Sequence, residues 1–496
     1  MINFNDLFIF EMANNHQGDV EHGINIINAM GDIAKKYSVN ASVKLQYRQL
    51  DTFIHPDFRN DKEAKHISRF LSTELKPDQF YELVKATKAN GLMTICTPFD
   101  EASVDLIVKH GIDVIKVASC SADDWPLLEK IVSTQKPVIA STGGLSVNQI
   151  DNLISFLNNR SSKFAILHCV GIYPSPNETL NLNFLGRLIS RYPEITIGYS
   201  GHEAPGNTDV IKIAIAKGAR IFERHVGLPT DTITLNNYSM NPAEVDKWIE
   251  AALIAKEILG GDKVVTKSEE DSLLSLKRGV FARNAIKKGA LISDDNVFFA
   301  MPCADGQLNS GQFGTYRAEF RASKDYKANE AVYEKAERDT YSKLRQIIHD
   351  ARGQLAEAGI VLNENAEAEL SHHYGLEKFS EYGCLIVNLV NREYCKKIIV
   401  VFPGQKHPEQ YHIKKEETFH VLKGELLATI NGIERLLKKG EIITIERGDK
   451  HAFTSMNGCI FEEVSTTHFR NDSFYSDPRI AEQDPMARKT VLSSIN

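Results

Sequence analysis

The sequence has no long apolar run and no excess of positive charge. Its 496 residues include 58 Lys and Arg against 65 Asp and Glu, which gives a formal net charge of -7 at pH 7. No stretch approaches the roughly 20 apolar residues of a membrane-spanning helix. The first residues also lack the basic and apolar regions of a signal peptide. We therefore expect a cytoplasmic protein with no nucleic-acid partner and no membrane partner.

Cysteine pairs of the C-x-x-C kind are also absent. The seven cysteines are scattered, and several of them, such as Cys96, Cys169 and Cys384, lie inside apolar runs. Such residues behave as small buried hydrophobic side chains in a reducing compartment. We assign them neither a disulfide nor a metal.

A glycine-rich phosphate loop is missing after the first predicted strand, which runs into Glu11-Met12-Ala13-Asn14. This argues against a doubly wound open sheet, the competing architecture. From residue 7 to about 259, short apolar strands alternate with amphipathic helices, a pattern that predicts an α/β (β/α)8 (TIM) barrel. The eight expected strands are 7–12, 41–46, 92–97, 114–118, 138–141, 164–169, 195–200 and 220–226.

Chemically active residue types occupy the C-terminal ends of these strands, where barrel enzymes carry their active sites. Lys44 and Lys116 each end a strand whose neighbours should be buried. With the nearby hydroxyls they predict a site for a phosphate and a carboxylate. His202 and His225 follow two successive strands, so both rings can meet over one mouth of the barrel and hold a divalent metal. The hydroxyls are those of Thr97, Ser119, Ser141 and Thr142.

These motifs resemble those of the sialic acid (N-acetylneuraminate) synthase family. They lie at 11–19, 44–46, 97–99, 116–119, 141–143, 168–176, 198–202 and 223–225, in register over about 250 residues. The resemblance implies a metal-dependent barrel that condenses phosphoenolpyruvate with an open-chain N-acyl hexosamine. The products are a nine-carbon 2-keto-3-deoxy acid and phosphate.

The resemblance also implies residue roles. His202 and His225 would bind the metal, expected to be Mn²⁺ with Mg²⁺ or Co²⁺ as alternatives. Glu11 would act on the attacking water, and Glu223 would support the histidines. The catalytic set is then Glu11, Lys44, Lys116, His202, His225 and Glu223, and the substrate-binding set is Gln46, Thr97, Ser119, Ser141, Thr142, His168, Tyr173 and Ser200.

Departures from the family pattern concern the sugar. Ser119-Cys120-Ser121 stands where relatives commonly have a glutamate, and Gly171 where many have asparagine. The acidic residue usual before Ser-Met-Asn-Pro is missing at 235–238. These changes favour a modified hexosamine or another aldose over plain N-acetylmannosamine.

Two further regions follow the barrel, which we expect at 1–262. Residues 272–332 resemble the small β-rich antifreeze-like (SAF) domain of this family, which implies a homodimer, with swapped domains as one arrangement of it. The arginine that such domains insert is absent at Ala300-Met301-Pro302-Cys303. A helical linker at 333–362 should contain one amphipathic helix over 341–359.

The last region, 363–480, resembles the cupin superfamily, a small β-barrel, and more loosely the cupins with sugar isomerase activity. The motifs are Gln410-Tyr-His412 with Glu417, and His451 after a glycine turn. By position, Gln410, His412, Glu417 and His451 would be ligands of a second metal. A metal-free cupin that binds sugar or mediates dimer contact is the alternative.

The sequence therefore predicts a nonulosonic acid synthase made of three folded parts. Two alternatives remain open. In the first, the protein is bifunctional and its cupin isomerises or epimerises a sugar. In the second, it is a non-catalytic sugar-binding or regulatory protein.

Overall fold

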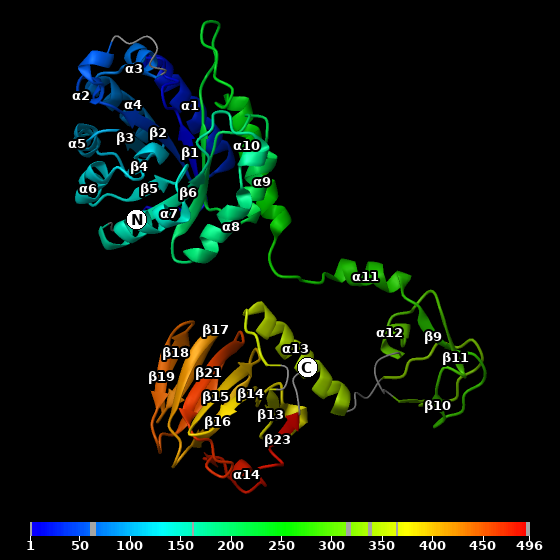
Figure 1. Ribbon diagram of the computed structural model, residues 1–496. Coiled ribbons are helices and arrows are strands. Elements are labelled where there is room, and N and C mark those ends of the chain that lie inside the picture. The colour runs from blue at the N-terminus through cyan, green and yellow to red at the C-terminus, as the bar shows by residue number, and fades with distance from the viewer. Residues whose placement is uncertain are drawn as a thin grey trace. The chain divides into compact units, whose positions relative to one another are not determined.

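The computed structural model describes residues 2–59, 66–160, 163–313, 319–335, 340–363 and 366–492. Residues 314–318, 336–339 and 364–365, which fall in the predicted second and third regions, lie outside the described residues. The chain divides into two compact units, Met1–Lys263 and Val264–Asn496 (Figure 1).

The first unit is a closed barrel of eight parallel strands surrounded by helices (Figure 1). Each strand pairs with the next along the chain, and β8 closes the ring on β1. This confirms the (β/α)8 prediction and excludes the open sheet. The strands, each within one residue of its expected ends, are β1 (Leu7–Glu11), β2 (Ala41–Tyr47), β3 (Met93–Pro98), β4 (Val114–Val117), β5 (Val138–Ser141), β6 (Phe164–Cys169), β7 (Thr196–Gly201) and β8 (Ile221–His225).

Ten helices of this unit are described between and after these strands. Several begin with a side-chain cap, for example Asp19 before the first helix and Asn241 before the last, which satisfies amide groups that the first turn leaves free. The helices are α1 (Val20–Tyr37), α2 (Leu50–Phe53), α3 (Ile67–Ser72), α4 (Pro77–Ala89), α5 (Glu101–Lys109), α6 (Trp125–Ser133), α7 (Val147–Arg160), α8 (Leu182–Arg191), α9 (Asp209–Ala216) and α10 (Pro242–Leu259).

Side-chain alternation divides each barrel strand between two environments. In β1, Phe8 and Phe10 belong to the apolar layer under the helices, whereas Leu7 and Ile9 belong to a separate cluster contributed by the barrel strands. Because alternate residues share a face, Glu11 continues the inward series beyond Leu7 and Ile9. The barrel interior is thus apolar at one end and polar at the C-terminal ends of the strands.

Gly198 in β7 lets this interior close. A Cβ atom at that position would lie 2.5 Å from Cβ of Ile221 and 2.6 Å from Cδ2 of Leu167. Both neighbours belong to the inward apolar cluster. Any larger residue would push apart the strands that carry the two predicted metal-binding histidines.

The second unit begins with α11 (Lys267–Leu276) and a small β-rich module. Two short antiparallel pairs, β9 with β11 and β10 with β12, enclose their own apolar cluster, which includes Val280, Ile292 and Phe320. The elements are β9 (Gly279–Ala282), β10 (Leu291–Ile292), β11 (Val297–Ala300), α12 (Ser310–Phe313) and β12 (Phe320–Arg321).

The rest of this unit is a curled antiparallel sheet consistent with the predicted cupin, preceded by α13 (Thr340–Glu357). Ala351 and Leu355 of that helix pack into one of two apolar clusters of the sheet. The strands are β13 (Glu367–Ser371), β14 (Cys384–Asn391), β15 (Tyr394–Val401), β16 (Lys406–Tyr411), β17 (Glu417–Ile430), β18 (Ile433–Lys438), β19 (Ile442–Ile445), β20 (His451–Thr454), β21 (Cys459–Thr466), β22 (Phe474–Tyr475) and β23 (Lys489–Leu492), with α14 (Pro478–Ala481) between the last two.

The C-terminal strand extends the sheet past the predicted boundary at residue 480. β23 pairs with β13, so the end of the chain returns to the start of this region. Across the described parts of the chain, no helix combines the length and apolar character needed to cross a membrane.

Candidate active site and metal centres

A cavity of about 1600 Å³ opens at the C-terminal ends of the barrel strands. Every barrel residue predicted for the site lines it. These residues come from all eight strands or from the loops that follow them, which explains how positions far apart in the sequence meet. They are Glu11, Lys44, Gln46, Thr97, Lys116, Ser119, Ser141, Thr142, His168, Tyr173, Ser200, His202, Glu223 and His225.

Two lysines and two glutamates form a buried ionic cluster in the cavity floor. Lys44 Nζ forms an ion pair with Glu11 and lies 2.9 Å from Glu223 Oε1. Lys116 Nζ lies 3.9 Å from the same Glu223 oxygen and donates a hydrogen bond of 2.6 Å to Ser141 Oγ. All four charged side chains are at most 5% exposed. The lysines are therefore held rigidly, with their ammonium groups at the cavity surface.

Burial controls the ionisation of this cluster. Desolvation lowers the pKa of Lys44 to about 8, although Glu223 opposes the shift. Burial alone would raise the pKa of Glu223, but the charges of Lys116 and Lys44 hold it below its usual range. Near pH 7 the two cations and two anions balance. A divalent metal beside them would make the cavity positive, which suits a polyanionic substrate.

The predicted hydroxyl ligands differ in what they already bind. Thr97 Oγ1 is buried without a hydrogen-bond partner, so it is free for a ligand. Ser119 Oγ accepts from the Gly143 amide at 3.0 Å, and Ser200 Oγ donates to Glu223 at 2.8 Å. Thr142 donates its hydroxyl proton to the Leu167 carbonyl. Thr97, Ser119 and Ser141, which accepts from Lys116, therefore keep a hydroxyl proton for a ligand.

His168 is held by the backbone, although it reaches the cavity. Its Nε2 pairs with the Leu180 carbonyl at 2.8 Å, and its ring packs against Phe184 and Tyr199. The substrate contact predicted for this residue is thus left to its other ring nitrogen. Glu11 uses Oε1 to accept from the Ala13 amide and from Gln46 Nε2.

His202 and His225 form a pair whose ring centres lie 5.3 Å apart. His202 Nδ1 pairs with the Val170 carbonyl at 3.0 Å, which leaves Nε2 as the ligand atom. Burial lowers the pKa of His202 to about 4 and the pKa of His225 well below its usual value. Both rings are therefore neutral at pH 7, as metal ligands must be, and the pair fits a divalent cation.

No carboxylate of the described residues completes this pair. Glu223, predicted to support the histidines, has its Oε1 engaged by Lys44 and Ser200, while its Oε2 is buried without a hydrogen-bond partner. The rings of Tyr173 and Tyr238 pack around the pair. The distance between ring centres is 4.1 Å for Tyr173 and His202, and 5.1 Å for Tyr238 and His225. Two protein ligands leave several coordination positions open, as a catalytic metal requires.

Sequence reasoning missed Arg48 and Tyr238, which also line the cavity. Arg48 continues the series Lys44, Gln46 on the inward face of β2, one step past its end. Extending the alternation beyond the strand would have found it. Tyr238 lies on the loop between β8 and α10, and no local pattern distinguishes it from a surface tyrosine.

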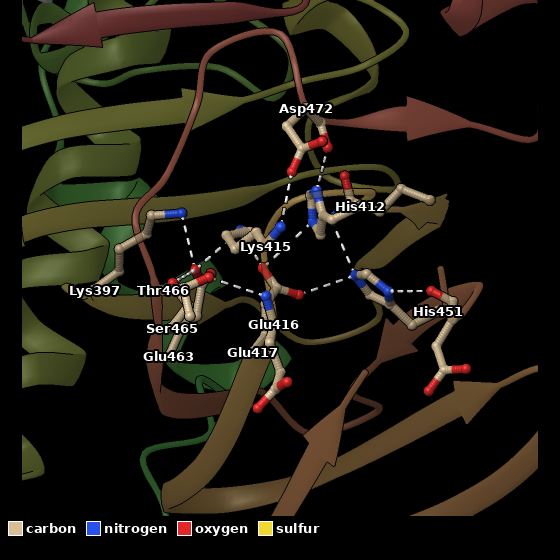
Figure 2. Close-up of polar contacts among 12 residues, drawn as sticks. Lys397, His412, Lys415, Glu416, Glu417, His451, Glu463, Ser465, Thr466 and Asp472 are labelled. Carbon is tan, nitrogen blue, oxygen red and sulfur yellow. Dashed lines mark hydrogen bonds and ion pairs between the residues drawn. The ribbon is translucent and has the colours of Figure 1, made fainter. Parts of the chain in front are cut away.

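The cupin holds a second cluster, formed by His412, Glu417 and His451 (Figure 2). Their ligand atoms all lie within 4.8 Å of one another. His412 Nε2 is 3.4 Å from Glu417 Oε1, and His451 Nε2 is 3.2 Å from Glu417 Oε2. His412 Nε2 and Glu417 Oε2 are buried without a hydrogen-bond partner. The donor set and these two free atoms fit a divalent metal.

Gln410, the fourth predicted ligand, lies next to this cluster. Its Nε2 is 3.3 Å from His451 Nε2. His407 precedes it on β16, where the pairing register with β20 shifts between residues 407 and 410. The backbone of Asp472 fixes the opposite side by pairing with His412 Nδ1, and the side chain of Asp472 accepts from the amides of residues 413–415. The segment after residue 468 thus supports the metal-binding cluster from this side.

A buried lysine shares the carboxylate of this cluster. Lys415 forms an ion pair with Glu417 and lies 3.2 Å from Glu463 Oε1, which also binds Lys397 at 3.0 Å (Figure 2). Burial alone would lower the pKa of Lys415, but the two glutamates raise it above its usual value. Burial likewise opposes the effect of Lys415, which holds the pKa of Glu417 well below its usual range. The carboxylate is therefore ionised with or without a metal.

A closed (β/α)8 barrel with a charged cavity at its C-terminal face is an architecture of metabolic enzymes. Family models match two parts of the chain: the NeuB family at residues 30–264, and a cupin domain at 397–458. A protein of Methanocaldococcus jannaschii, described as uncharacterized, is 33% identical over 297 residues, which are 59% of this chain and 84% of that protein. The chain belongs to the NeuB family, the family of the sialic acid synthases.

The alignments with two further proteins span most of the length of those proteins. N,N'-diacetyllegionaminic acid synthase of Campylobacter jejuni is 26% identical over 343 residues, 66% of this chain and 99% of that enzyme. The crystal structure of a putative spore coat polysaccharide biosynthesis protein E from Chromobacterium violaceum is 46% identical, with a TM-score of 0.62, over 66% of this chain and 98% of that one. Each of these two alignments leaves about a third of this chain uncovered.

Proposed function

We propose that this protein is a nonulosonic acid synthase that condenses phosphoenolpyruvate with an open-chain N-acyl hexosamine or a related aldose. The observation that carries the proposal is the meeting of Lys44, Lys116, His202 and His225 around one cavity. Membership of the NeuB family supports the reaction class. Relatives named as legionaminic, pseudaminic and N-acetylneuraminate-9-phosphate synthases support a sugar acid as product.

The lysines are assigned to phosphoenolpyruvate. Lys44 and Lys116 present two ammonium groups at the cavity floor, which suits a ligand with a carboxylate and a phosphate. Thr97 and Ser119 have hydroxyl protons to donate to such oxygens, and Ser141 orients Lys116. Ser200 positions Glu223, and through it both lysines.

The histidine pair is assigned to the metal, for which Mn²⁺ is our proposal. A divalent cation held by His202 and His225 would polarise the aldehyde of the acceptor sugar. Tyr173 and Gln46 lie on the cavity wall beside these groups and are assigned to the sugar. The paired tyrosine rings exclude water from one side of the histidines.

The bonds balance as follows. C3 of phosphoenolpyruvate forms a bond to the aldehyde carbon, whose oxygen becomes a hydroxyl. Water adds at C2, and phosphate leaves with the oxygen that joined it to C2, so that a 2-keto group remains. Glu11 is the group assigned to hold this water or take its proton, because its carboxylate lines the cavity floor beside Lys44.

We also propose the domain organisation and assembly. Residues 272–332 would form an SAF domain, 333–362 a helical linker and 363–480 a cupin, in a homodimer. The separate apolar cluster around Val280 and Phe320 supports an independently packed module in the first of these regions.

One assay tests the proposal. The purified protein is incubated with Mn²⁺, phosphoenolpyruvate and a panel of hexosamines and simple aldoses, and phosphate release and product mass are measured. We expect release that depends on one class of sugar, with a product heavier by one pyruvate unit. Lys116→Gln should abolish release, whereas Lys109→Gln on the exposed surface of α5 should not. No release with any sugar, despite bound metal, contradicts the proposal.

A second candidate activity rests on the cupin. The cluster of His412, Glu417 and His451, whose ligand atoms lie within 4.8 Å of one another, favours a metal there, and a metal beside a buried lysine could serve the isomerisation or epimerisation of a sugar. The same sugar panel, incubated without phosphoenolpyruvate and analysed for isomers, tests this activity. Unchanged sugars in the presence of cupin-bound metal would contradict it.

A further inference from the structure

Arg48 is a cation in the wall of the barrel cavity that the proposed reaction does not use. Its guanidinium lies between two phenyl rings, with Cζ 3.7 Å from the ring centre of Phe99 and 4.2 Å from that of Phe70. These rings come from the end of β3 and from α3. Such stacking on two faces fixes the plane of the group and leaves only its edge for hydrogen bonds.

This edge is only partly satisfied. Nη2 donates to Gln46 Oε1 at 2.8 Å, and Nε is buried without a hydrogen-bond partner. Among the described residues, no carboxylate comes within ion-pairing distance of Arg48. The nearby Asp100 is occupied by the Gln49 amide and by Ser103. A half-buried cation without a counterion is unfavourable, so a bound anion would stabilise it.

The order of side chains along β2 places this cation. Lys44, Gln46 and Arg48 follow one another at alternate positions, so they face the same cavity in that order from the floor outward. Lys44 belongs to the phosphoenolpyruvate site and Gln46 to the sugar site. Arg48 therefore lies at the end of the acceptor remote from its reacting aldehyde.

A neighbouring arginine adds positive charge at this place. Arg69 of the adjoining α3 lines the same cavity. The volume of about 1600 Å³ exceeds the few hundred to 1,000 Å³ of an ordinary ligand pocket. The cavity has room for phosphoenolpyruvate and for a sugar that carries a further group.

The geometry points to an anion subsite at Arg48. On the basis of the proposed function, the acceptor is an N-acyl hexosamine or aldose with an anionic group, a phosphate ester or a carboxylate, at the end remote from the aldehyde. Arg48 binds that group through its free edge and holds Gln46 against the sugar at the same time. Burial lowers the pKa of Arg48 to about 10, and the group stays charged at pH 7.

Calorimetry with unreactive acceptors tests this subsite. The probes are the open-chain alditol of N-acetylmannosamine, its 6-phosphate and its 6-carboxylate analogue, which cannot condense because they lack the aldehyde. Each is titrated into the full-length protein with Mn²⁺ and phosphoenolpyruvate. We expect at least one anionic probe to bind ten or more times tighter than the neutral one, and the stronger of the two identifies the anion. The preference should shrink as salt is raised.

Variants separate charge recognition from a structural role. Arg48→Gln should reduce the preference to less than threefold, and Arg48→Lys should restore part of it. Arg187→Gln removes another arginine stacked on a phenylalanine, Phe184, but outside the cavity lining, and should leave the preference intact. Unfolding temperatures show that each variant is folded. A merely positional role for Arg48 would weaken all three probes equally.

Equal affinity for neutral and anionic probes, or no binding of any probe, overturns the subsite. So does a tenfold preference that survives in Arg48→Gln. A separate titration with phosphoenolpyruvate distinguishes this outcome from failure of the proposed reaction. If the protein does not bind phosphoenolpyruvate, the proposed synthase function is contradicted. The preference for anionic probes is then measured without phosphoenolpyruvate.

Discussion

The barrel and the cupin each bring two histidines to nearly the same separation, yet they surround them differently. The ring centres are 5.3 Å apart for His202 and His225 and 5.4 Å for His412 and His451. In the cupin, Glu417 reaches both rings, whereas in the barrel Glu223 is held by lysines. To a metal, the cupin would thus offer three protein ligands and the barrel two.

The difference shows how two similar pairs of histidines can stand in different charge environments. The barrel pair faces a large cavity and has neutral rings, which leaves room for a substrate on the metal. In the cupin, burial opposes protonation, but the Glu417 carboxylate raises the pKa of His451 above its usual value. This centre carries its own anion and a buried cation, Lys415, so its charge is balanced before any metal arrives.

The largest effect is expected from removing one histidine of each pair. His225→Gln should lower kcat/KM for condensation at least roughly a thousandfold, about 4 kcal/mol, because the aldehyde loses its polarising cation. Metal analysis of this variant should show the loss of one equivalent of metal, the one bound in the barrel. His451→Gln should lose the cupin equivalent alone. If either variant loses both metals, the two centres are not independent and the comparison fails.

Removal of Lys415 is expected to have the next largest effect. Lys415→Met leaves Glu417 and Glu463 as buried carboxylates without this cation, which should cost roughly 3–5 kcal/mol of unfolding free energy in EDTA. Mn²⁺ should recover part of the loss because it replaces the missing charge. Denaturant unfolding with and without metal measures both values. Lys414→Met, at the exposed neighbour, is the control, and an equal loss there would refute the argument.

Ser141→Ala tests how the barrel orients its lysine. Lys116 would lose the hydroxyl that accepts its hydrogen bond, which for a charged donor is worth about 1.5–3 kcal/mol. The KM for phosphoenolpyruvate should rise roughly tenfold or more. Ser465→Ala removes a comparable hydroxyl, which donates to Glu463 in the cupin network, and should leave that KM unchanged. The KM of both variants is measured from steady-state phosphate release.

The smallest effect is a pH dependence that only the barrel should show. The pKa of Lys44 lies near 8, so its ammonium is present below pH 8 and is lost as the pH rises above it. The KM for phosphoenolpyruvate should rise about tenfold from pH 7 to 9. Lys44→Arg keeps its charge throughout and should flatten this profile. Cupin metal content should stay constant over the range, since the pKa of Lys415 is raised. A flat wild-type profile would contradict the assignment of Lys44.

The barrel was predictable because its signals are local. A short apolar run that ends in a polar residue is visible within six or seven positions, so all eight strands and most of the cavity residues at their ends followed from the sequence. Glu223 shows the limit. Its place on β8 was predictable, but its pairing with Lys44 rather than with the histidines depends on two strands brought together by closure of the barrel.

The cupin ligands were likewise visible as a spaced motif, but their surroundings were not. Lys415 stands in the charged run 414–417, and Asp472 in a polar segment near the C-terminus. Both are buried against the centre because β22 pairs with β16 and returns the tail to it. Nothing local in the sequence distinguishes such a returning segment from a disordered end.

By itself, the sequence determined which residue types stand at the ends of the barrel strands and along the cupin motif, because alternation and spacing are properties of adjacent residues. The tertiary structure alone decided how these groups share charge. It paired the buried lysines with particular carboxylates and gave Arg48 none among the residues that the structure describes. Charge pairing depends on distances between segments remote in the chain, and these become definite only when the barrel and the sheet close.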